Sequence, residues 1–382
     1  MRKTHENDNF QNYPMLFSRK IKTTIWGSYS LYGEPDLAKN AEKNPDLPKI
    51  GEIWNFCDSN IYVLNGPMKL CAMREIFETA PPSFFGPRYY GHYKEKGAFP
   101  LLCKIIDAND RLSVQVHPDD SRAHDLEGAP SGKAEMWYIL EAAPDAEIII
   151  GFSGKINENE FRSHLDDHSF VDYLNHVKVK KGDTFLIPAG RIHSIGAGVI
   201  IAEIQQNCDI TYRVYDYGRT DGSGNLRQLH VDKAIKCIDF ADILPNEIEA
   251  VTAFERSGAV LSLLAACHYF TVIMHEIEGG RYSYHNAIPV VSIFMNTGPD
   301  VFINYNGSRE RFSSYSTLLV PASCENVEFT LCADRPENAC GNATTTGGIK
   351  LIQSYHLPDR LENARILKGF FGAAPGLSQF DI

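Results

Sequence analysis

Four side chains, carried by three short segments, have the types and spacing of a metal-binding site. The segment LSVQVHPDD alternates in a strand-like way, so Gln115 and His117 point to the same face. Glu135 opens the strand-like run EMWYIL, and His193 ends the pattern GDTFLIPAGRIH. Two imidazoles, one carboxylate and one amide oxygen can supply four ligands to a divalent ion. Such a set suits Zn²⁺ and also admits Mn²⁺, Fe²⁺, Co²⁺ or Ni²⁺.

A structural role for these histidines is the competing interpretation. The chain has 13 histidines, and a single histidine in a strand is usually a core or surface residue. The pattern that ends at His193 is more specific, because it constrains Gly, Asp, Pro, Gly and His together. The acidic pair Asp119–Asp120 follows His117 directly and is typical of a turn and helix cap, not of metal ligands.

The elements that must position these side chains are mostly short strands. Apolar runs such as TFLIPAG, GVIIAEIQQ and YFTVIMHEI recur at short intervals with turn residues between them. This pattern predicts an all-β protein, a sandwich or barrel, with a few short helices. We expect short helices within residues 157–177 and 229–240. The aromatic segment 81–93 is rich in Pro and Gly and is predicted to form neither strand nor helix.

The strand pattern begins again near residue 251. Residues 313–329 align with the segment that contains His193, but Asn326 stands at the place of the histidine. We therefore predict a second barrel that binds no metal. The expected domains are residues 1–240, which carry the metal site, residues 241–358, which form the second barrel, and a C-terminal tail, 359–382.

Composition narrows the class of ligand. The 382 residues are 43% hydrophobic and carry a formal net charge of −11, which argues against non-specific nucleic-acid binding. No run of 18 or more apolar residues is present, and the N-terminus lacks the apolar core of a signal peptide. The nine cysteines form no CxxC pair, and we expect free thiols in a reducing cytoplasm. A small-molecule ligand is expected, with neither nucleic acid nor membrane as partner.

The motifs described above resemble those of the cupin barrel, and together with GKAEMWYIL and EIQQNCDITYRVYDYGR they resemble the type I phosphomannose isomerases in their compact bacterial form. The resemblance implies two cupin-type (jelly-roll) β-barrels packed together. It also implies reversible isomerisation of mannose-6-phosphate to fructose-6-phosphate through a cis-enediol, with one divalent metal ion, Zn²⁺ being the first candidate.

The resemblance further implies roles for individual residues. Those that match the metal ligands of the family are Gln115, His117, Glu135 and His193. Those that match its active-site arginine, lysine and acidic residue are Arg213, Lys133 and Glu203, and those that match its phosphate-binding positions are Lys104 and Ser113. The chain departs from the larger members at Gly132, where they have a histidine, so any ring-opening role of that histidine falls elsewhere or to water.

Several alternatives stay open at this point. The proton-transfer base is either Lys133 or Glu203, and Arg213 either clamps a substrate oxygen or phosphate or pairs structurally with Asp209 or Asp216. Trp137 is expected to be a core residue. A non-catalytic sugar-phosphate-binding cupin, an isomerase of another phosphosugar and a cupin oxygenase are the competing functions.

Overall fold

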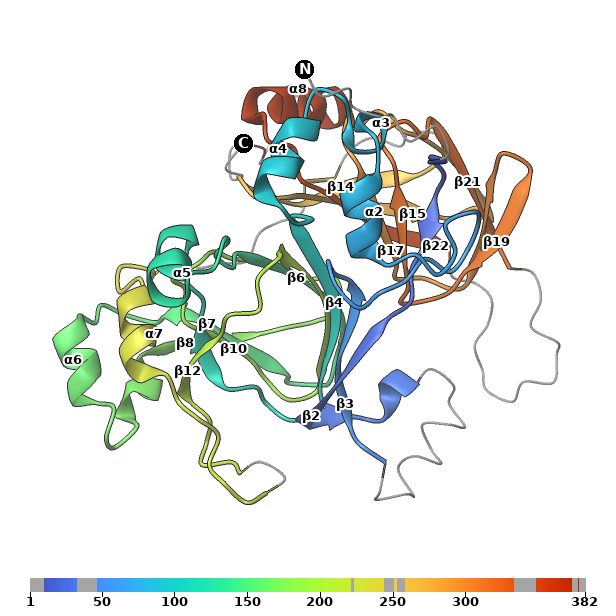
Figure 1. Ribbon diagram of the computed structural model, residues 1–382. Coiled ribbons are helices and arrows are strands. Elements are labelled where there is room, and N and C mark those ends of the chain that lie inside the picture. Colours follow the sequence, from blue (N-terminus) through green and yellow to red (C-terminus); the bar gives the residue numbers. More distant parts are fainter. Residues whose placement is uncertain are drawn as a thin grey trace, which may run out of the picture. The chain divides into compact units, whose positions relative to one another are not determined.

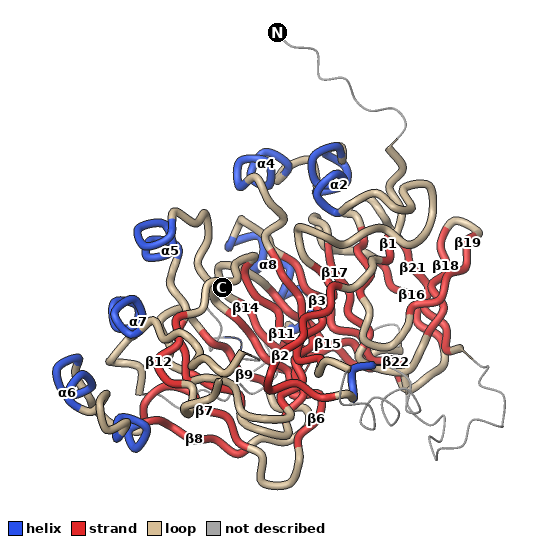
Figure 2. Tube along the Cα trace, turned by 60° about the horizontal axis from the view of Figure 1, so that its bottom comes forward, coloured by secondary structure: helices blue, strands red, loops and turns tan. Residues whose placement is uncertain are grey.

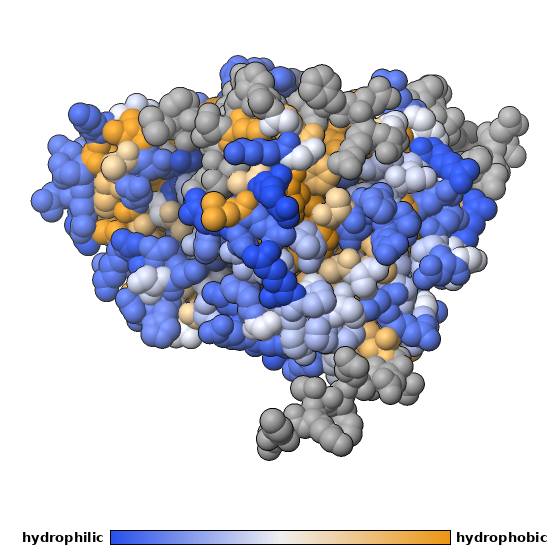
Figure 3. Space-filling view, turned by 90° about the horizontal axis from the view of Figure 1, so that it is seen from above, coloured by the Kyte–Doolittle hydropathy of each residue, from blue (hydrophilic) through white to orange (hydrophobic). Residues whose placement is uncertain are grey.

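The structure is a computed structural model that describes residues 10–32, 47–220, 223–243, 251–252, 258–332, 348–372 and 377. Strands, arranged in four sheets, dominate this part of the chain, and the helices are short (Figures 1 and 2). The prediction of a mostly β protein is confirmed. No helix of the described residues is long and apolar enough to cross a membrane. On the face seen in Figure 3, hydrophilic residues predominate and hydrophobic ones are scattered among them.

The chain divides into two compact units. Unit 1 comprises residues 1–20, 55–101 and 249–382, and unit 2 comprises residues 21–54 and 102–248. The change from unit 2 to unit 1 thus falls after residue 248. Residues 55–101, which the sequence analysis assigned to the first domain, belong to unit 1 together with the C-terminal residues.

Unit 2 contains a six-stranded and a five-stranded sheet. In spatial order, the six strands are β2 (Lys20–Ser28), β3 (Ile50–Phe56), β4 (Leu101–Ala108), β11 (Val199–Gln206), β6 (Glu135–Ala142) and β9 (Thr184–Ile187). The five strands are β12 (Tyr212–Tyr215), β5 (Val114–Val116), β10 (His193–Ile195), β7 (Glu147–Phe152) and β8 (Leu174–Lys178). Residues from both sheets form one hydrophobic cluster, in which Trp137, Ile150 and Phe185 are almost fully buried.

Short helices of unit 2 occupy both regions in which the sequence predicts them. Residues 157–177 contain α6 (Glu158–Ser163) and the 3-10 helix η2 (Ser169–Tyr173), and residues 229–240 contain α7 (Val231–Cys237). The 3-10 helix η1 (Ser30–Tyr32) lies outside these regions. Asn157 and Glu160 form a reciprocal capping box at the start of α6. Asp119 accepts a hydrogen bond from the backbone N–H of Arg122 at the start of α5 (Asp120–Glu127), which confirms the helix cap after His117.

Unit 1 also contains two sheets. The seven strands of the larger one are, in spatial order, β1 (Met15–Leu16), β20 (Thr317–Val320), β17 (Ser292–Asn296), β22 (Ile349–Tyr355), β15 (Thr271–Ile277), β14 (Val260–Ala266) and β13 (Val251–Thr252). The smaller sheet contains β16 (Arg281–His285), β21 (Asn326–Leu331), β18 (Val301–Tyr305) and β19 (Ser308–Phe312).

The two units repeat one strand order. The strands β4-β11-β6-β9 of unit 2 match β15-β22-β17-β20 of unit 1, and β5-β10-β7-β8 match β16-β21-β18-β19. The strands of each set follow one another along the chain in the same sequence. The register agrees as well, because His193 pairs with Gln115 as Asn326 pairs with His285.

Helices in unit 1 correct one prediction. The aromatic segment 81–93 was expected to be irregular, but it contains α3 (Pro82–Phe85) and the start of α4 (Tyr90–Lys96), and α2 (Met73–Thr79) precedes it. Proline is tolerated at the first helical position, where its missing N–H is not needed, so Pro82 begins a helix instead of preventing one. Within the predicted tail 359–382, α8 (Arg360–Phe371) is an ordinary helix capped by Asp359; residues 373–376 and 378–382 lie outside the described part.

Candidate metal centre and adjoining cavity

Three of the four predicted ligands meet inside unit 2. His117 follows the last residue of β5, Glu135 is the first residue of β6, and His193 is the first residue of β10. One ligand atom from each lies within 4.8 Å of the other two, and all three residues are buried. Among the described residues no other group of three His, Cys, Asp or Glu side chains meets this condition. The side chains therefore converge although 76 residues separate the first from the last along the chain (193 − 117).

Backbone carbonyl groups fix the orientation of both imidazoles. Nδ1 of His117 lies 2.8 Å from the carbonyl oxygen of Ile210, and Nδ1 of His193 lies 2.9 Å from that of Arg191. A carbonyl oxygen only accepts, so each Nδ1 donates and each neutral ring keeps its lone pair on Nε2. Such orientation by the second ring nitrogen is typical of metal-binding histidines.

Burial keeps both imidazoles neutral. It lowers the pKa of His193 to about 3, with the neighbouring His117 acting in the same direction. Burial and then the Lys133 ammonium lower the pKa of His117. A neutral imidazole is the form that binds a metal ion.

Glu135 is the anionic member of the group. Burial alone would raise its pKa, but Lys133 and His117 outweigh this effect and hold the pKa well below its usual value. Its Oε2 accepts a hydrogen bond from Nε1 of Trp137 at 3.1 Å, and its buried Oε1 lies 2.5 Å from Nζ of Lys133 and 3.2 Å from Nε2 of His117. An ionised carboxylate that already faces one cation and lies beside the Nε2 atoms of two neutral imidazoles fits a divalent cation.

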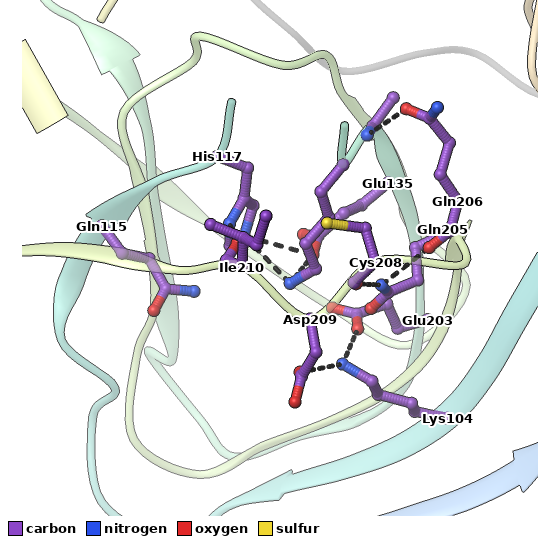
Figure 4. A network of polar contacts seen from close by, with 12 residues as sticks. Lys104, Gln115, His117, Glu135, Glu203, Gln205, Gln206, Cys208, Asp209 and Ile210 are labelled. Carbon is purple, nitrogen blue, oxygen red and sulfur yellow. Dashed lines mark hydrogen bonds and ion pairs between the residues drawn. The ribbon is translucent and has the colours of Figure 1, made fainter. Parts of the chain in front are cut away.

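Gln115 lies beside this group. Its Nε2 is 3.3 Å from Nε2 of His193, and its Oε1 accepts a hydrogen bond from Ser113 Oγ at 3.2 Å. Figure 4 shows its amide to one side of His117. Rotating the amide by 180° about its last bond exchanges oxygen and nitrogen with almost no change of shape, and this would turn the oxygen toward His193.

The Lys133 ammonium group occupies the space among the ligands. Its Nζ lies 2.5 Å from Oε1 of Glu135 and 3.1 Å from Nε2 of His117. A metal ion held by these two residues would compete with the ammonium group, because both cations need the same oxygen and the same lone pair.

A second buried ion pair adjoins the ligands. Lys104 Nζ lies 3.1 Å from Oε1 of Glu203 and 3.9 Å from Oδ1 of Asp209, as Figure 4 shows. Burial alone would lower the pKa of Lys104, but Glu203 and the other surrounding carboxylates raise it above its usual value. Burial, followed by the nearby Glu135 charge, raises the pKa of Glu203.

A cavity of about 580 Å³ brings these groups together with further cations. Its lining includes six of the predicted site residues, which are Lys104, Ser113, Gln115, Lys133, Glu203 and Arg213. Arg213 pairs with Gln115 across β12 and β5, so both side chains share one face. Among the described residues no carboxylate forms an ion pair with Arg213; Asp216, one of its two expected partners, pairs instead with Arg219 and Arg227.

The sequence analysis missed several residues of this cavity. Arg227 and His230 line it, and Nδ1 of His230 accepts a hydrogen bond from the backbone N–H of Arg213 at 3.3 Å. They follow β12 by a dozen or more residues, so no local spacing connects them with the motifs. Lys22, on β2, also lines the cavity and sits 4.2 Å from the ring centre of Trp54.

Gly132 lies against the turn that follows His117. Its N–H donates to Oδ1 of Asp120 at 2.7 Å. A Cβ atom at this position would lie 2.4–2.6 Å from backbone atoms of Pro118, Asp119 and Asp120. Real Cβ atoms essentially never approach backbone so closely, so this backbone leaves no room for a side chain at residue 132.

These features define a class, a β-sheet protein in which two buried histidines and a glutamate form a candidate metal site beside a polar, cation-lined cavity. A model of the phosphomannose isomerase type I catalytic domain matches residues 15–161. The mannose-6-phosphate isomerase ManA of Bacillus subtilis is 36% identical over 271 residues, which are 70% of this chain and 80% of that protein. The probable mannose-6-phosphate isomerase GmuF of the same organism is 31% identical over 314 residues, 81% of this chain and 94% of that protein.

Solved structures agree. The crystal structure of the Bacillus subtilis mannose 6-phosphate isomerase matches with a TM-score of 0.73 at 25% identity and covers 90% of this chain and all of that one. A zinc-bound holo structure of a mannose 6-phosphate isomerase shares the fold, with a TM-score of 0.64 at 13% identity over 90% of this chain and 99% of that one. The chain belongs to the type I phosphomannose isomerase family.

Proposed function

We propose that this chain interconverts mannose-6-phosphate and fructose-6-phosphate. The observation that carries the proposal is the convergence of His117, Glu135 and His193 beside a cavity lined by lysine and arginine, in a member of this family. The cavity volume of about 580 Å³ falls within the range of small-molecule sites.

The proposed metal ligands are Nε2 of His117 and His193, Oε1 of Glu135, which the ion would take over from Lys133, and the amide oxygen of Gln115. This mixture of neutral nitrogen and charged and neutral oxygen suits one Zn²⁺ ion. When bound, a divalent ion supplies Lewis acidity to the carbonyl and hydroxyl oxygens of the sugar. The carbonyl oxygens of Ile210 and Arg191 keep the two imidazoles in the binding tautomer.

The phosphate of the substrate is assigned to the cationic lining of the cavity. Lys104 and Ser113 are the positions expected from the family resemblance. Lys104 also neutralises Glu203, so we assign the larger part of phosphate binding to Arg213. The guanidinium group of Arg213 has no carboxylate partner among the described residues and can bind an oxyanion through two hydrogen bonds.

Proton transfer is assigned to Lys133 and Glu203, both of which line the cavity. The base removes the proton from C2 and returns it to C1, and the hydroxyl proton moves from O2 to O1, so that aldose becomes ketose through a cis-enediol. A carboxylate whose pKa is raised by burial is a stronger base than an exposed one, which favours Glu203 for the first step.

The remaining assignments concern the whole chain. We propose that each unit is a cupin-type jelly-roll barrel, that the two barrels pack together, and that the domain of residues 241–358 is a second barrel without a metal site. The repeated strand order supports this duplication. A cytoplasmic location is proposed because none of the eight cysteines of the described residues forms a disulfide.

The decisive experiment is a coupled isomerase assay on mannose-6-phosphate with and without a chelator, using the wild type and the variant His117→Ala. We expect activity that the chelator abolishes and added Zn²⁺ restores, and none in the variant. Phosphate-dependent binding without turnover in metal-loaded wild type would indicate a sugar-phosphate-binding protein and would overturn the proposal.

A further inference from the structure

The indole of Trp137 joins two carboxylates of the site. Its Nε1 lies 3.1 Å from Oε2 of Glu135 and 3.1 Å from Oε2 of Glu203. Trp137 is fully buried, and both glutamates are at least 98% buried. One N–H therefore serves two buried carboxylates, a proposed metal ligand on β6 and a candidate base on β11.

The other oxygen of each carboxylate, Oε1 of Glu135 and Oε1 of Glu203, forms an ion pair. The first faces Lys133 and the second faces Lys104, at 2.5 and 3.1 Å. The indole thus determines which oxygen of each glutamate is tied to the core and which is presented to the ligand group or the cavity.

The shared indole N–H offsets part of the cost of burying the two carboxylates. Two buried carboxylates close together repel each other, and each loses hydration on burial. A donor placed between them offsets part of both effects, and the low local dielectric strengthens the bond. The ring edge also packs on His193, with the ring centres 5.4 Å apart and the planes at 78°. Trp137 therefore contacts three groups of the site.

Unit 1 provides an internal comparison. Trp137 pairs across the sheet with Glu203 and Phe185, and the matching residue Phe294 pairs with Gln353 and Leu318. At the place of Glu203, unit 1 therefore has the neutral Gln353, and at the place of Trp137 it has a phenyl ring without a donor. The indole N–H is present in the unit that has carboxylates and absent in the unit that lacks them.

We propose that Trp137 is a positioning residue that orients Glu135 toward the metal ion and holds the Glu203 carboxylate at the cavity. The role of Glu203 in turnover rests on the proposed function, whereas the effect on Glu135 is independent of it. If Trp137 were only a core residue, as the sequence predicts, it would fill space in the hydrophobic cluster and would not orient either carboxylate.

The test replaces Trp137 by Phe, the residue that unit 1 has at this place. The matched control is Phe185→Leu, which removes aromatic volume from the same cluster but no hydrogen bond. Affinity for Co²⁺ is measured on metal-free protein by chelator competition, the visible spectrum of the Co²⁺ form reports the ligand geometry, and kcat and KM are measured at saturating metal.

We expect Trp137→Phe to lower Co²⁺ affinity by about 10- to 100-fold and to alter the spectrum, because partners of metal ligands have effects of this size. At saturating metal, kcat should fall about tenfold with little change in KM. Phe185→Leu should lower stability and leave affinity, spectrum and kcat unchanged. Wild-type affinity and spectrum in Trp137→Phe, or equal losses in both variants, would overturn the inference.

A second measurement needs no variant at residue 137. The chain has three tryptophans, so ¹⁵N-labelled indole groups give three N–H resonances, assigned with Trp26→Phe and Trp54→Phe. We expect the Trp137 resonance to be protected from exchange with water and to shift when Zn²⁺ is added. An unprotected resonance that Zn²⁺ does not move contradicts the inference. If the wild type binds metal but does not isomerise mannose-6-phosphate, the proposed function fails while the metal-affinity result still decides this inference.

Discussion

Unit 1 and unit 2 share a strand order but differ in the chemistry of their interiors. Matching positions follow from the register: in unit 1 the residues at the places of Gln115, Glu135, His193 and Glu203 are His285, Ser292, Asn326 and Gln353. Both glutamates become neutral residues, and the buried histidine ligand becomes an exposed asparagine. The same arrangement of strands therefore supports a charged site in one unit and none in the other, which shows that the fold alone does not specify function.

The two interiors also satisfy their polar groups differently. In unit 1, His275 bonds to Gln353 and to Tyr282 at 2.9 and 3.0 Å, and Gln353 donates to Tyr284 and Ser292. This network is neutral and internally bonded. In unit 2, the carboxylates of Glu135 and Glu203 are buried in ion pairs with Lys133 and Lys104. Buried ion pairs thus occur where a ligand is expected, whereas the polar groups of unit 1 are satisfied by neutral hydrogen bonds.

The largest effect is expected when His193 of unit 2 is replaced by asparagine, the residue at the matching position of unit 1. His193→Asn removes an imidazole ligand, so bound metal should be lost and kcat/KM should fall by about 10³-fold or more. Metal content by mass spectrometry and the isomerase assay measure both. The control is Asn326→Ser, at the matching exposed position of unit 1, which should change neither. Full metal content in His193→Asn would contradict the ligand assignment.

The next largest effect concerns the buried ion pair. Lys104→Met leaves Glu203 buried beside Glu135 without its cation, so the free energy of unfolding of the metal-free protein should fall by about 3–5 kcal/mol at pH 7. Replacing both partners, in Lys104→Met/Glu203→Leu, should recover much of this loss because no uncompensated charge remains. Denaturant titration measures both variants. A double variant no more stable than the single one would count against the ion pair as the cause.

The neutral network of unit 1 predicts a pH dependence. Burial, only partly opposed by the hydrogen bond to Gln353, lowers the pKa of His275 from 6.5 to about 4. As pH falls, the unfolded chain binds the proton first, so stability is complete above pH 6.5 and is lost between pH 6.5 and 4. The loss should reach about 3 kcal/mol. His275→Gln should remove this part of the dependence, measured as the difference from wild type across that range; parallel curves would contradict the prediction.

The smallest effect concerns a turn that both units share. Gly182 has φ = +96°, and no atom lies within 4 Å of a Cβ built there. Gly182→Ala should therefore cost about 1–2 kcal/mol through backbone strain alone, and Gly182→Asn should cost less because Asn tolerates positive φ better. Tyr315, at the matching place in unit 1, adopts φ = +54°. Thermal unfolding measures the difference, and an unchanged midpoint in Gly182→Ala would show that the turn relaxes.

Local spacing was sufficient to predict that His117, Glu135 and His193 come together and that the strand pattern repeats. His117, Glu135 and His193 stand at strand ends marked by turn residues, so the motifs identified them without tertiary information. Arg227 and His230 could not be found in this way, because they reach the cavity through a loop beyond β12. Residues 82–85 escaped prediction for another reason: proline and glycine at the ends of a short helix resemble the composition of a loop.

Trp137 shows an intermediate case. Alternation along β6 places it on the same face as Glu135, and this much follows from the sequence. Its second partner, Glu203, arrives from β11 through a register that no local pattern encodes. From the sequence alone, Trp137 was therefore expected to be a core residue. Only the pairing of β6 with β11 brings its indole N–H to the carboxylates of both Glu135 and Glu203.

The tight contact at Gly132 restricts how sequences of this family can diverge. A histidine introduced here by a single codon change would collide with the peptide groups of residues 118–120, immediately after a ligand. A side chain at residue 132 therefore requires a different course of the turn that directly follows His117.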